Sequence, residues 1–234
     1  MVAKPQKRTP ETKSSGKRTR TQLIMLVFGV LFAIAMVGSY LAPAMGIFKS
    51  VKPGDSAIID YTIRDAAGVA VLTTSQTVLV DTYNSGDVSF LTSQMSLVGG
   101  ANASSRVTAV PIYLPDGTTA DFALLESDVT DLTNGILGMH EQESKTIPLT
   151  LSDLPQQMSA TGADQMGINF TESQVGDRFT IAMTITDDPT IFTDPENEIS
   201  YIRVGTITGK TNDTLLVNFG YSTAEVKVLS IAQA

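Results

Sequence analysis

The only histidine of the chain, His140, lies in the sequence HEQES between acidic and polar neighbours. An imidazole titrates near neutral pH, which makes His140 the first candidate for a general base or a metal ligand. A zinc site needs several nitrogen or sulfur ligands, and the chain has no cysteine and no second histidine. No Gly-x-Ser-x-Gly motif is present to suggest a hydrolase triad. We therefore interpret His140 as part of a solvent-facing turn.

Two further patterns could bind ligands, and neither has the required spacing. Gly99-Gly100 and Gly135-x-x-Gly138 are isolated pairs that do not lead from a strand into a helix, as a nucleotide-binding loop would. An acidic stretch lacks the order of ligands that an EF-hand requires for calcium, and its members are Asp187, Asp188, Asp194, Glu196 and Glu198. We expect a solvated loop there, and we expect no metal and no cofactor.

The charges of the chain are unevenly distributed. Seven of the 16 Lys and Arg residues precede residue 23, whereas the remainder has nine basic and 23 acidic residues, a net charge of -14. An acidic surface repels the phosphate backbone, so we expect no nucleic-acid partner. The chain also has no tryptophan and only 6% aromatic residues, which disfavours a stacking platform for bases or sugars.

The segment LIMLVFGVLFAIAMVGSYLA, which begins at Leu23, has no charged residue. Its ~20 residues have the length of a membrane-spanning helix, and the basic block before it predicts a cytoplasmic N-terminus. We therefore expect a basic tail over 1–22, a bilayer anchor over 23–45 and a single-pass cell-membrane protein with an extracytoplasmic C-terminal domain. A cleaved signal peptide is the alternative, because Ala42-Pro43-Ala44 resembles a cleavage site.

Three Asn-x-Ser/Thr triplets are compatible with an exterior location. They begin at Asn102, Asn169 and Asn212, and each is a possible glycosylation site.

The remainder alternates apolar and polar residues with many β-branched side chains, which predicts strands. The segment SAIIDYTIR, from Ser56 to Arg64, is the strongest example, and VAVLTTSQTVLV after it also predicts a strand region. The best helix candidate is 124–137, with Val129, Leu132 and Ile136 on one face. These patterns predict an α+β, β-rich domain with one short helix.

Three sets of segments, in order, resemble the FKBP-type peptidyl-prolyl isomerases, in particular the SlyD-like branch with an insert-in-flap domain. The first is VKPGDSAIIDYTIRDAAGVAVLTTS and the second is LTNGILGMHEQESKTIPL. The third set is SQVGDRFTIAM with YIRVGTITGKTNDTLLVNFG and AEVKVLSI. The resemblance implies an antiparallel FKBP-like sheet over 51–158 and 222–234, with 76–120 as a divergent insertion, and an inserted small β domain over 159–221.

The resemblance also implies a proline pocket without a catalytic acid or base. Tyr61 matches the tyrosine at the end of the family's first strand, and Val129 and Leu132 match positions on the pocket floor. Val71-Leu72 replaces the aromatic-acid pair of the second strand, so we place Val71 at the pocket but expect weak or absent activity.

The implied function is a membrane-tethered isomerase and folding factor that acts on X-Pro bonds of exported proteins, with an unfolded or proline-containing polypeptide as its partner. A non-catalytic chaperone-like module is the alternative, with Phe179, Ile181 and Met183 as candidate client-binding residues. A structural subunit of an envelope complex is the other alternative.

Overall fold

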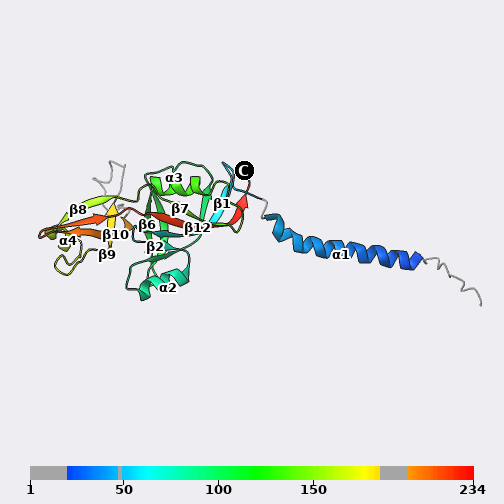
Figure 1. Ribbon diagram of the computed structural model, residues 1–234, viewed down its shortest axis with the longest axis horizontal. Helices are drawn as coiled ribbons and strands as arrows, with labels where there is room; N and C mark the ends of the chain where they lie inside the picture. The colour runs from blue at the N-terminus through cyan, green and yellow to red at the C-terminus, as the bar shows by residue number, and fades with distance from the viewer. Residues whose placement is uncertain (1–19, 47–48, 185–199) are drawn as a thin grey trace, which may run out of the picture. The chain divides into compact units, whose positions relative to one another are not determined.

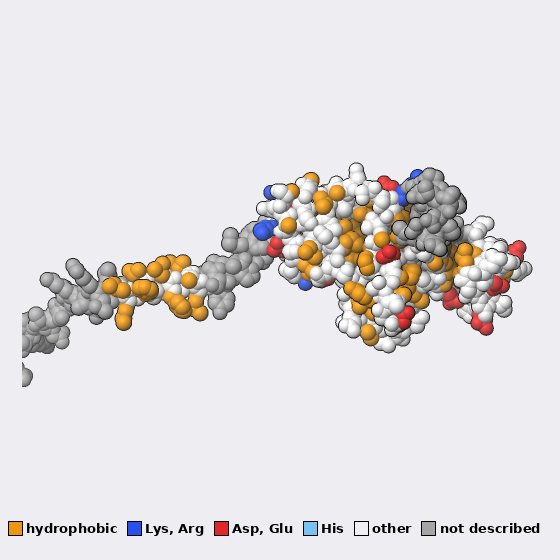
Figure 2. Space-filling model, turned by 180° about the vertical axis from the view of Figure 1, so that it is seen from behind, with side chains coloured by type: hydrophobic (Ala, Val, Ile, Leu, Met, Phe, Trp, Pro, Cys, Tyr) orange, Lys and Arg blue, Asp and Glu red, His pale blue; other side chains and the backbone are white. Residues whose placement is uncertain are grey.

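The computed structural model describes the backbone of residues 20–46, 49–184 and 200–234. The chain divides into two compact units, Met1–Met45 and Gly46–Ala234. Helix α1 (Arg20–Gly46) makes up the described part of the first unit and ends one residue beyond it. Its side chains are described from 24 to 37 and are all exposed (Figure 2). The acidic loop positions between 187 and 198 lie outside the described residues.

The membrane anchor predicted over 23–45 is not supported. Among the residues that the structure describes, no helix is both long enough and apolar enough to cross a membrane. The predicted bilayer contact and the single-pass cell-membrane location depended on this anchor, so they are corrected with it.

The second unit contains one sheet of 12 strands, ordered β7-β12-β1-β2-β3-β5-β6-β10-β11-β8, with β4 paired to β1 and β9 paired to β10 (Figure 1). In chain order the strands are β1 (Ser56–Arg64), β2 (Ala70–Thr73), β3 (Phe90–Thr92), β4 (Met95–Val98), β5 (Val107–Tyr113), β6 (Thr119–Leu125), β7 (Ser144–Pro148), β8 (Pro155–Ser159), β9 (Arg178–Thr184), β10 (Ser200–Lys210), β11 (Thr214–Asn218) and β12 (Thr223–Ala232). The helices of this unit are α2 (Gln76–Asn84), α3 (Glu126–Gly135) and α4 (Ala160–Gln165).

The predicted fold class is wrong in two further respects. The sheet is mixed rather than antiparallel, because β2 pairs with β3 and β6 pairs with β10 in parallel. Three helices are present in this unit where one was expected. Local alternation cannot reveal either parallel pair, because both depend on contacts between distant parts of the chain.

Helix α2 replaces the second half of the predicted strand 69–80. The Ser75 hydroxyl accepts a hydrogen bond from the Val78 N–H at 3.4 Å and caps the first turn. The Thr82 hydroxyl donates to the Val78 carbonyl oxygen at 2.8 Å, within the helix. The β-branched run TVLV therefore adopts a helix, which local propensity disfavours only slightly.

Two apolar cores hold the unit together. The larger lies between α3 and the strands β1, β2, β6, β7 and β12 and includes Tyr61, Phe122, Leu132 and Tyr221. The smaller is formed by β8, α4, β10 and β11 around Met158, Ile207, Leu215 and Phe219. The second core falls in the region predicted as an inserted domain, but its strands continue the same sheet through β10. The domain boundaries at 158 and 221 stay a prediction.

Two glycines explain how α3 ends and packs. Gly138 has a φ of +78°, a conformation that glycine adopts readily at the end of a helix. A Cβ on Gly135 would lie 2.5 Å from the side chain of Ile147, so only glycine permits the observed approach of α3 to β7. The pattern Gly-x-x-Gly therefore positions a helix and has no role as a nucleotide loop.

Candidate binding cavity

A cavity of ≈ 290 Å³ is lined by residues of β4, β5 and α3. We call it the Tyr61 cavity, and its walls come from β1, from 92–98, 101–104 and 108–111, and from α3. Tyr61, Val129, Leu97 and Val110 are the main buried apolar groups in the walls. Aspartate, glutamate, lysine, arginine and histidine are all absent from the walls, within the part of the chain that is described.

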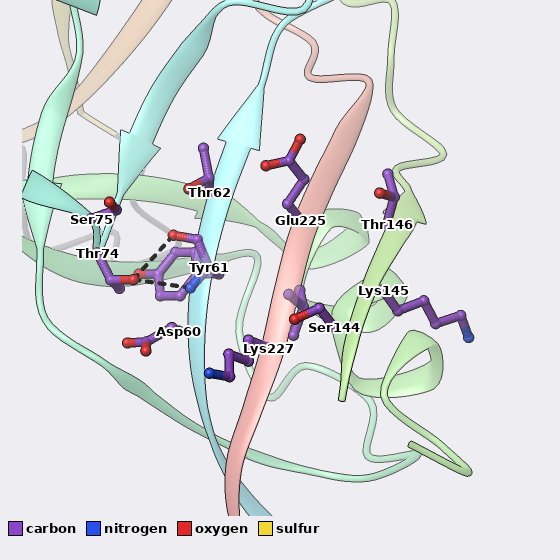
Figure 3. A pocket seen from close by; sticks show the side chains of 11 residues that line it. Asp60, Tyr61, Thr62, Thr74, Ser75, Ser144, Lys145, Thr146, Glu225 and Lys227 are labelled. Atoms are coloured by element: carbon purple, nitrogen blue, oxygen red, sulfur yellow. Dashed lines mark hydrogen bonds between the residues drawn. The ribbon is translucent and has the colours of Figure 1, made fainter. Parts of the chain in front are cut away.

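The backbone of Tyr61 holds the side chain in place. Its N–H donates to the Thr74 hydroxyl at 3.1 Å, and the Thr74 hydroxyl donates to its carbonyl oxygen at 3.4 Å (Figure 3). Alternation along β1 then directs the ring into the core, where Tyr61 is 2% exposed. The position of the ring therefore follows from the strand register.

The Tyr61 hydroxyl is buried and has no hydrogen-bond partner among the described residues. The neighbouring Thr92 hydroxyl donates instead to the Pro111 carbonyl oxygen at 2.8 Å. Burial raises the pKa of Tyr61 to about 12, a shift that the nearby Thr92 opposes only in part. The hydroxyl is therefore neutral at physiological pH. An unpaired buried hydroxyl costs about 1–3 kcal/mol, which a bound acceptor would recover.

The four predicted pocket residues do not all reach the cavity. Tyr61 and Val129 both line it. Val71 and Leu132 are fully buried in the larger core and are absent from the walls. Leu132 therefore packs in the core and is not part of the cavity wall. A substitution of Leu132 would test the stability of the core rather than binding.

Most of the cavity wall comes from the segment that the sequence left unassigned, 76–120. Thr92, Ser96, Leu97, Ala109 and Pro111 all line the cavity. The patterns considered in that segment, the Asn102 sequon and the pair Gly99-Gly100, did not indicate a peptide site. The turn-forming Pro115-Asp116-Gly117 lies between β5 and β6.

A larger pocket of ≈ 570 Å³ lies on the face of the sheet formed by β1, β7 and β12 (Figure 3). Most of its walls are hydroxyl and charged groups such as Thr62, Ser144 and Glu225, and Tyr61 lines this pocket as well as the Tyr61 cavity. Asp60 lies opposite Lys227 in the register of β1 and β12. We interpret this pocket as a solvated face of the sheet, because most of its lining side chains carry hydroxyl or charged groups.

The remaining candidates from the sequence lie away from the Tyr61 cavity, with one exception. His140 is exposed and its Nδ1 lies 3.1 Å from Glu143 Oε2, which fits a turn residue. Phe179 and Ile181 pack against the smaller core, and Met183 is half-buried.

Asn169 and Asn212 are exposed. Asn102 is exposed at the wall of the Tyr61 cavity. No cluster of three potential metal-ligating side chains occurs in the described residues.

The cavity is suited to binding and not to acid–base chemistry. It offers apolar groups, backbone groups and uncharged polar side chains, among them the hydroxyls of Tyr61, Thr92 and Thr133. No family model matches the chain, and no curated protein matches it.

Burial of tyrosines predicts a loss of stability at alkaline pH. Burial raises the pKa of Tyr61 and of Tyr221 to about 12, above the ordinary value near 10. Unfolding then releases protons between pH 10 and pH 12, so folding stability is complete below pH 10 and falls as the pH rises toward 12. We expect a loss of up to about 2–3 kcal/mol for each tyrosine at pH 12. Denaturant unfolding followed by circular dichroism at pH 8 to 11.5 measures it.

The matched variants are Tyr61→Phe and Tyr113→Phe. Tyr61→Phe should reduce the alkaline loss, whereas Tyr113 is 52% exposed and its replacement should not change the pH profile. Equal profiles for both variants would contradict the assignment to the buried ring.

Proposed function

We propose that the chain binds a proline-containing segment of unfolded polypeptide in the Tyr61 cavity and acts as a slow peptidyl-prolyl cis-trans isomerase of FKBP type. Supporting this is a single observation: Tyr61, whose buried hydroxyl has no hydrogen-bond partner among the described residues, lines a cavity whose described walls carry no ionisable side chain. The resemblance of the three sets of segments to that family points in the same direction.

The chemistry of prolyl isomerisation suits such a cavity. The barrier of ~18–20 kcal/mol to rotation arises from amide resonance, and X-Pro bonds are those that populate the cis form. In the twisted transition state the imide loses resonance, so it is less polar than the planar ground state. Apolar walls around the ring favour this state, and a neutral hydroxyl can hold a flanking carbonyl oxygen. No nucleophile, acid or metal is needed.

We expect low activity because the polar side chains in the described walls are uncharged. The buried hydroxyls of Thr92 and Thr133 already donate to backbone carbonyl oxygens. The chaperone-like alternative is less favoured, because the Phe179 ring already contacts Phe219 with ring centroids 6.0 Å apart. A client would have to displace this contact.

Tyr61→Phe tests the proposal. The variant keeps the ring and removes the hydroxyl, so kcat/KM on a proline tetrapeptide should fall about 3- to 10-fold, as expected for one neutral hydrogen bond. Tyr113→Phe is the control, since Tyr113 is exposed and does not line the cavity. No acceleration by the parent chain, or equal rates in parent and Tyr61→Phe, would overturn the assignment of the hydroxyl.

A further inference from the structure

One wall of the Tyr61 cavity is the edge of a strand. In the described part of the chain β4 pairs with β1 only, so its other edge has no strand partner. Backbone groups of an antiparallel strand point alternately to its two sides. The Gly99 N–H donates to the Asp55 carbonyl oxygen at 2.8 Å, at the end of the β1–β4 ladder. The backbone N–H and C=O groups of Leu97, two residues before Gly99, therefore point toward β1. Those of Ser96 point away from β1.

A second strand edge lines the same cavity. The Leu114 N–H donates to the Thr118 carbonyl oxygen at 3.0 Å, and the Glu126 N–H to the Arg106 carbonyl oxygen at 2.9 Å. These two hydrogen bonds lie at the two ends of the β5–β6 ladder. Because backbone groups alternate in direction along a strand, the N–H and C=O groups of the even-numbered residues of β5 point toward β6. The N–H and C=O of Ala109 therefore point away from β6, and β3 pairs with β5 only at the far end of the strand.

We infer that the cavity takes its polypeptide in extended conformation, as an added strand on the β4 edge at Ser96, with Ala109 as a second backbone contact. This inference rests on the proposed function and names the form of its substrate. Unpaired strand edges commonly bind peptides in this way, through main-chain hydrogen bonds with alternate side chains in pockets. Ser96 and Ala109 both line the cavity that Tyr61 also lines, and the Tyr61 hydroxyl has no partner among the described residues.

The geometry also restricts the sequence of the segment. Proline has no N–H, so it must occupy a position whose N–H would point away from β4, with its ring toward Tyr61 and Val129. Uncharged neighbours are expected, because no ionisable side chain lines the described walls. A preformed turn in a folded protein could not pair with the edge.

The test is a scan of N-methylated peptides against the full chain. An uncharged seven-residue peptide with a central proline is methylated at one backbone nitrogen at a time, and each affinity is measured by calorimetry. We expect an alternating pattern, in which methylation at every second position weakens binding at least fivefold and methylation at the positions between changes it less than twofold.

The contribution of the β4 edge is tested with the variant Ser96→Pro and its control Ser96→Ala. Both remove the hydroxyl contact with Ser56, but only proline removes the N–H at the edge. We expect about tenfold weaker binding for Ser96→Pro and a change within twofold for Ser96→Ala. A flat methylation scan overturns the added strand, even if Tyr61→Phe still lowers activity. Absence of binding by every peptide overturns the proposed function as well. If Ser96→Pro does not fold, the scan alone decides.

Discussion

Replacing Asp128 with alanine is expected to lower the free energy of unfolding by about 3–5 kcal/mol, because it leaves a buried guanidinium without its counter-ion. Arg203 and Asp128 are both 0% exposed, and Arg203 Nη1 lies 3.4 Å from Asp128 Oδ2. The same guanidinium donates to the carbonyl oxygens of Ala123 and Phe219 at 2.8 and 2.9 Å. It also lies 4.3 Å from the centre of the Tyr221 ring.

Asp128 has a second role at the start of α3. Its Oδ2 accepts the Leu125 N–H at 3.0 Å, so it caps the helix that supplies Val129 to the Tyr61 cavity. Burial raises the pKa of Asp128 above its ordinary value, although the Arg203 charge opposes the shift. Alanine removes both the cap and the charge, whereas asparagine can keep the cap.

The two roles are separated by comparing Asp128→Ala, Asp128→Asn and the double variant Asp128→Leu/Arg203→Met in urea unfolding of the full chain. We expect Asp128→Asn to be intermediate and the double variant to recover much of the loss, because it leaves no buried charge. A loss below about 1 kcal/mol for Asp128→Ala would show that the pair is hydrated and not buried.

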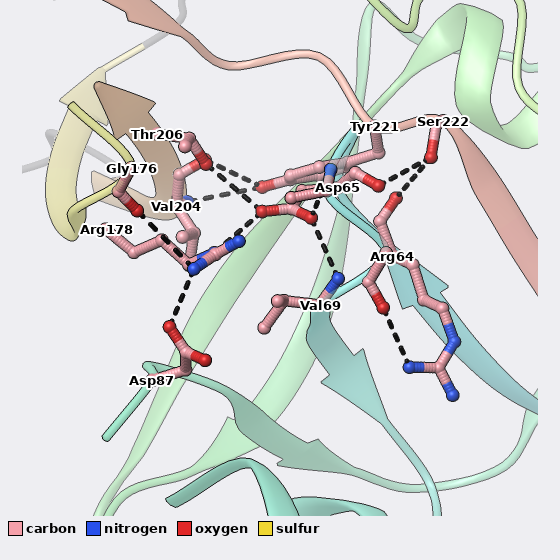
Figure 4. A network of polar contacts seen from close by, with 12 residues as sticks. Arg64, Asp65, Val69, Asp87, Gly176, Arg178, Val204, Thr206, Tyr221 and Ser222 are labelled. Carbon is pink, nitrogen blue, oxygen red and sulfur yellow. Dashed lines mark hydrogen bonds and ion pairs between the residues drawn. The ribbon is translucent and has the colours of Figure 1, made fainter. Parts of the chain in front are cut away.

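Replacing Asp65 with alanine is expected to cost about 3–4 kcal/mol and to loosen the contact between the two cores. Asp65 is 3% exposed, and its carboxylate accepts four hydrogen bonds (Figure 4). Oδ1 accepts the N–H groups of Ala67 and Val69, each at 2.9 Å. Oδ2 accepts Arg178 Nε at 2.7 Å and the Thr206 hydroxyl at 3.2 Å. The turn after β1 is thereby joined to β9 and β10.

Asp87→Ala is the matched control. Asp87 lies 2.7 Å from Arg178 Nη1, but its side chain is 25% exposed and this is its one contact with that arginine. We expect a loss of about 1 kcal/mol or less. Amide hydrogen exchange should show faster opening of β9 in Asp65→Ala than in Asp87→Ala. Equal effects of the two substitutions would contradict the central position of Asp65.

The parts of the fold that alternation predicts are the ones with one buried face. The bounds predicted for β1 are the observed ones. The pattern that predicts them is a buried apolar residue at every second position: Ala57, Ile59, Tyr61 and Ile63. α3 was also predicted, since its apolar residues recur at helical spacing. In contrast, the partners Asp65 and Arg178 are 113 residues apart, and no local pattern relates them.

The site was only partly predictable for a similar reason. Tyr61 and Val129 lie in segments with a clear period, and the structure brings both to one cavity. The contacts inferred for Ser96 and Ala109 involve their backbone groups, which no side-chain pattern reveals. Val71 and Leu132 show the opposite case, since an apolar residue at a matching position can serve the core alone.

Chemical-shift mapping would show whether the Tyr61 cavity is the peptide site. An isotope-labelled full chain is titrated with the uncharged proline peptide, and amide and methyl signals are followed. We predict that the largest shifts fall on Tyr61, Val129, Ser96 and Ala109 and that filling the cavity with Val129→Phe removes them. Shifts confined to Phe179 and its neighbours on β9, or no shifts at millimolar peptide, would contradict the claim.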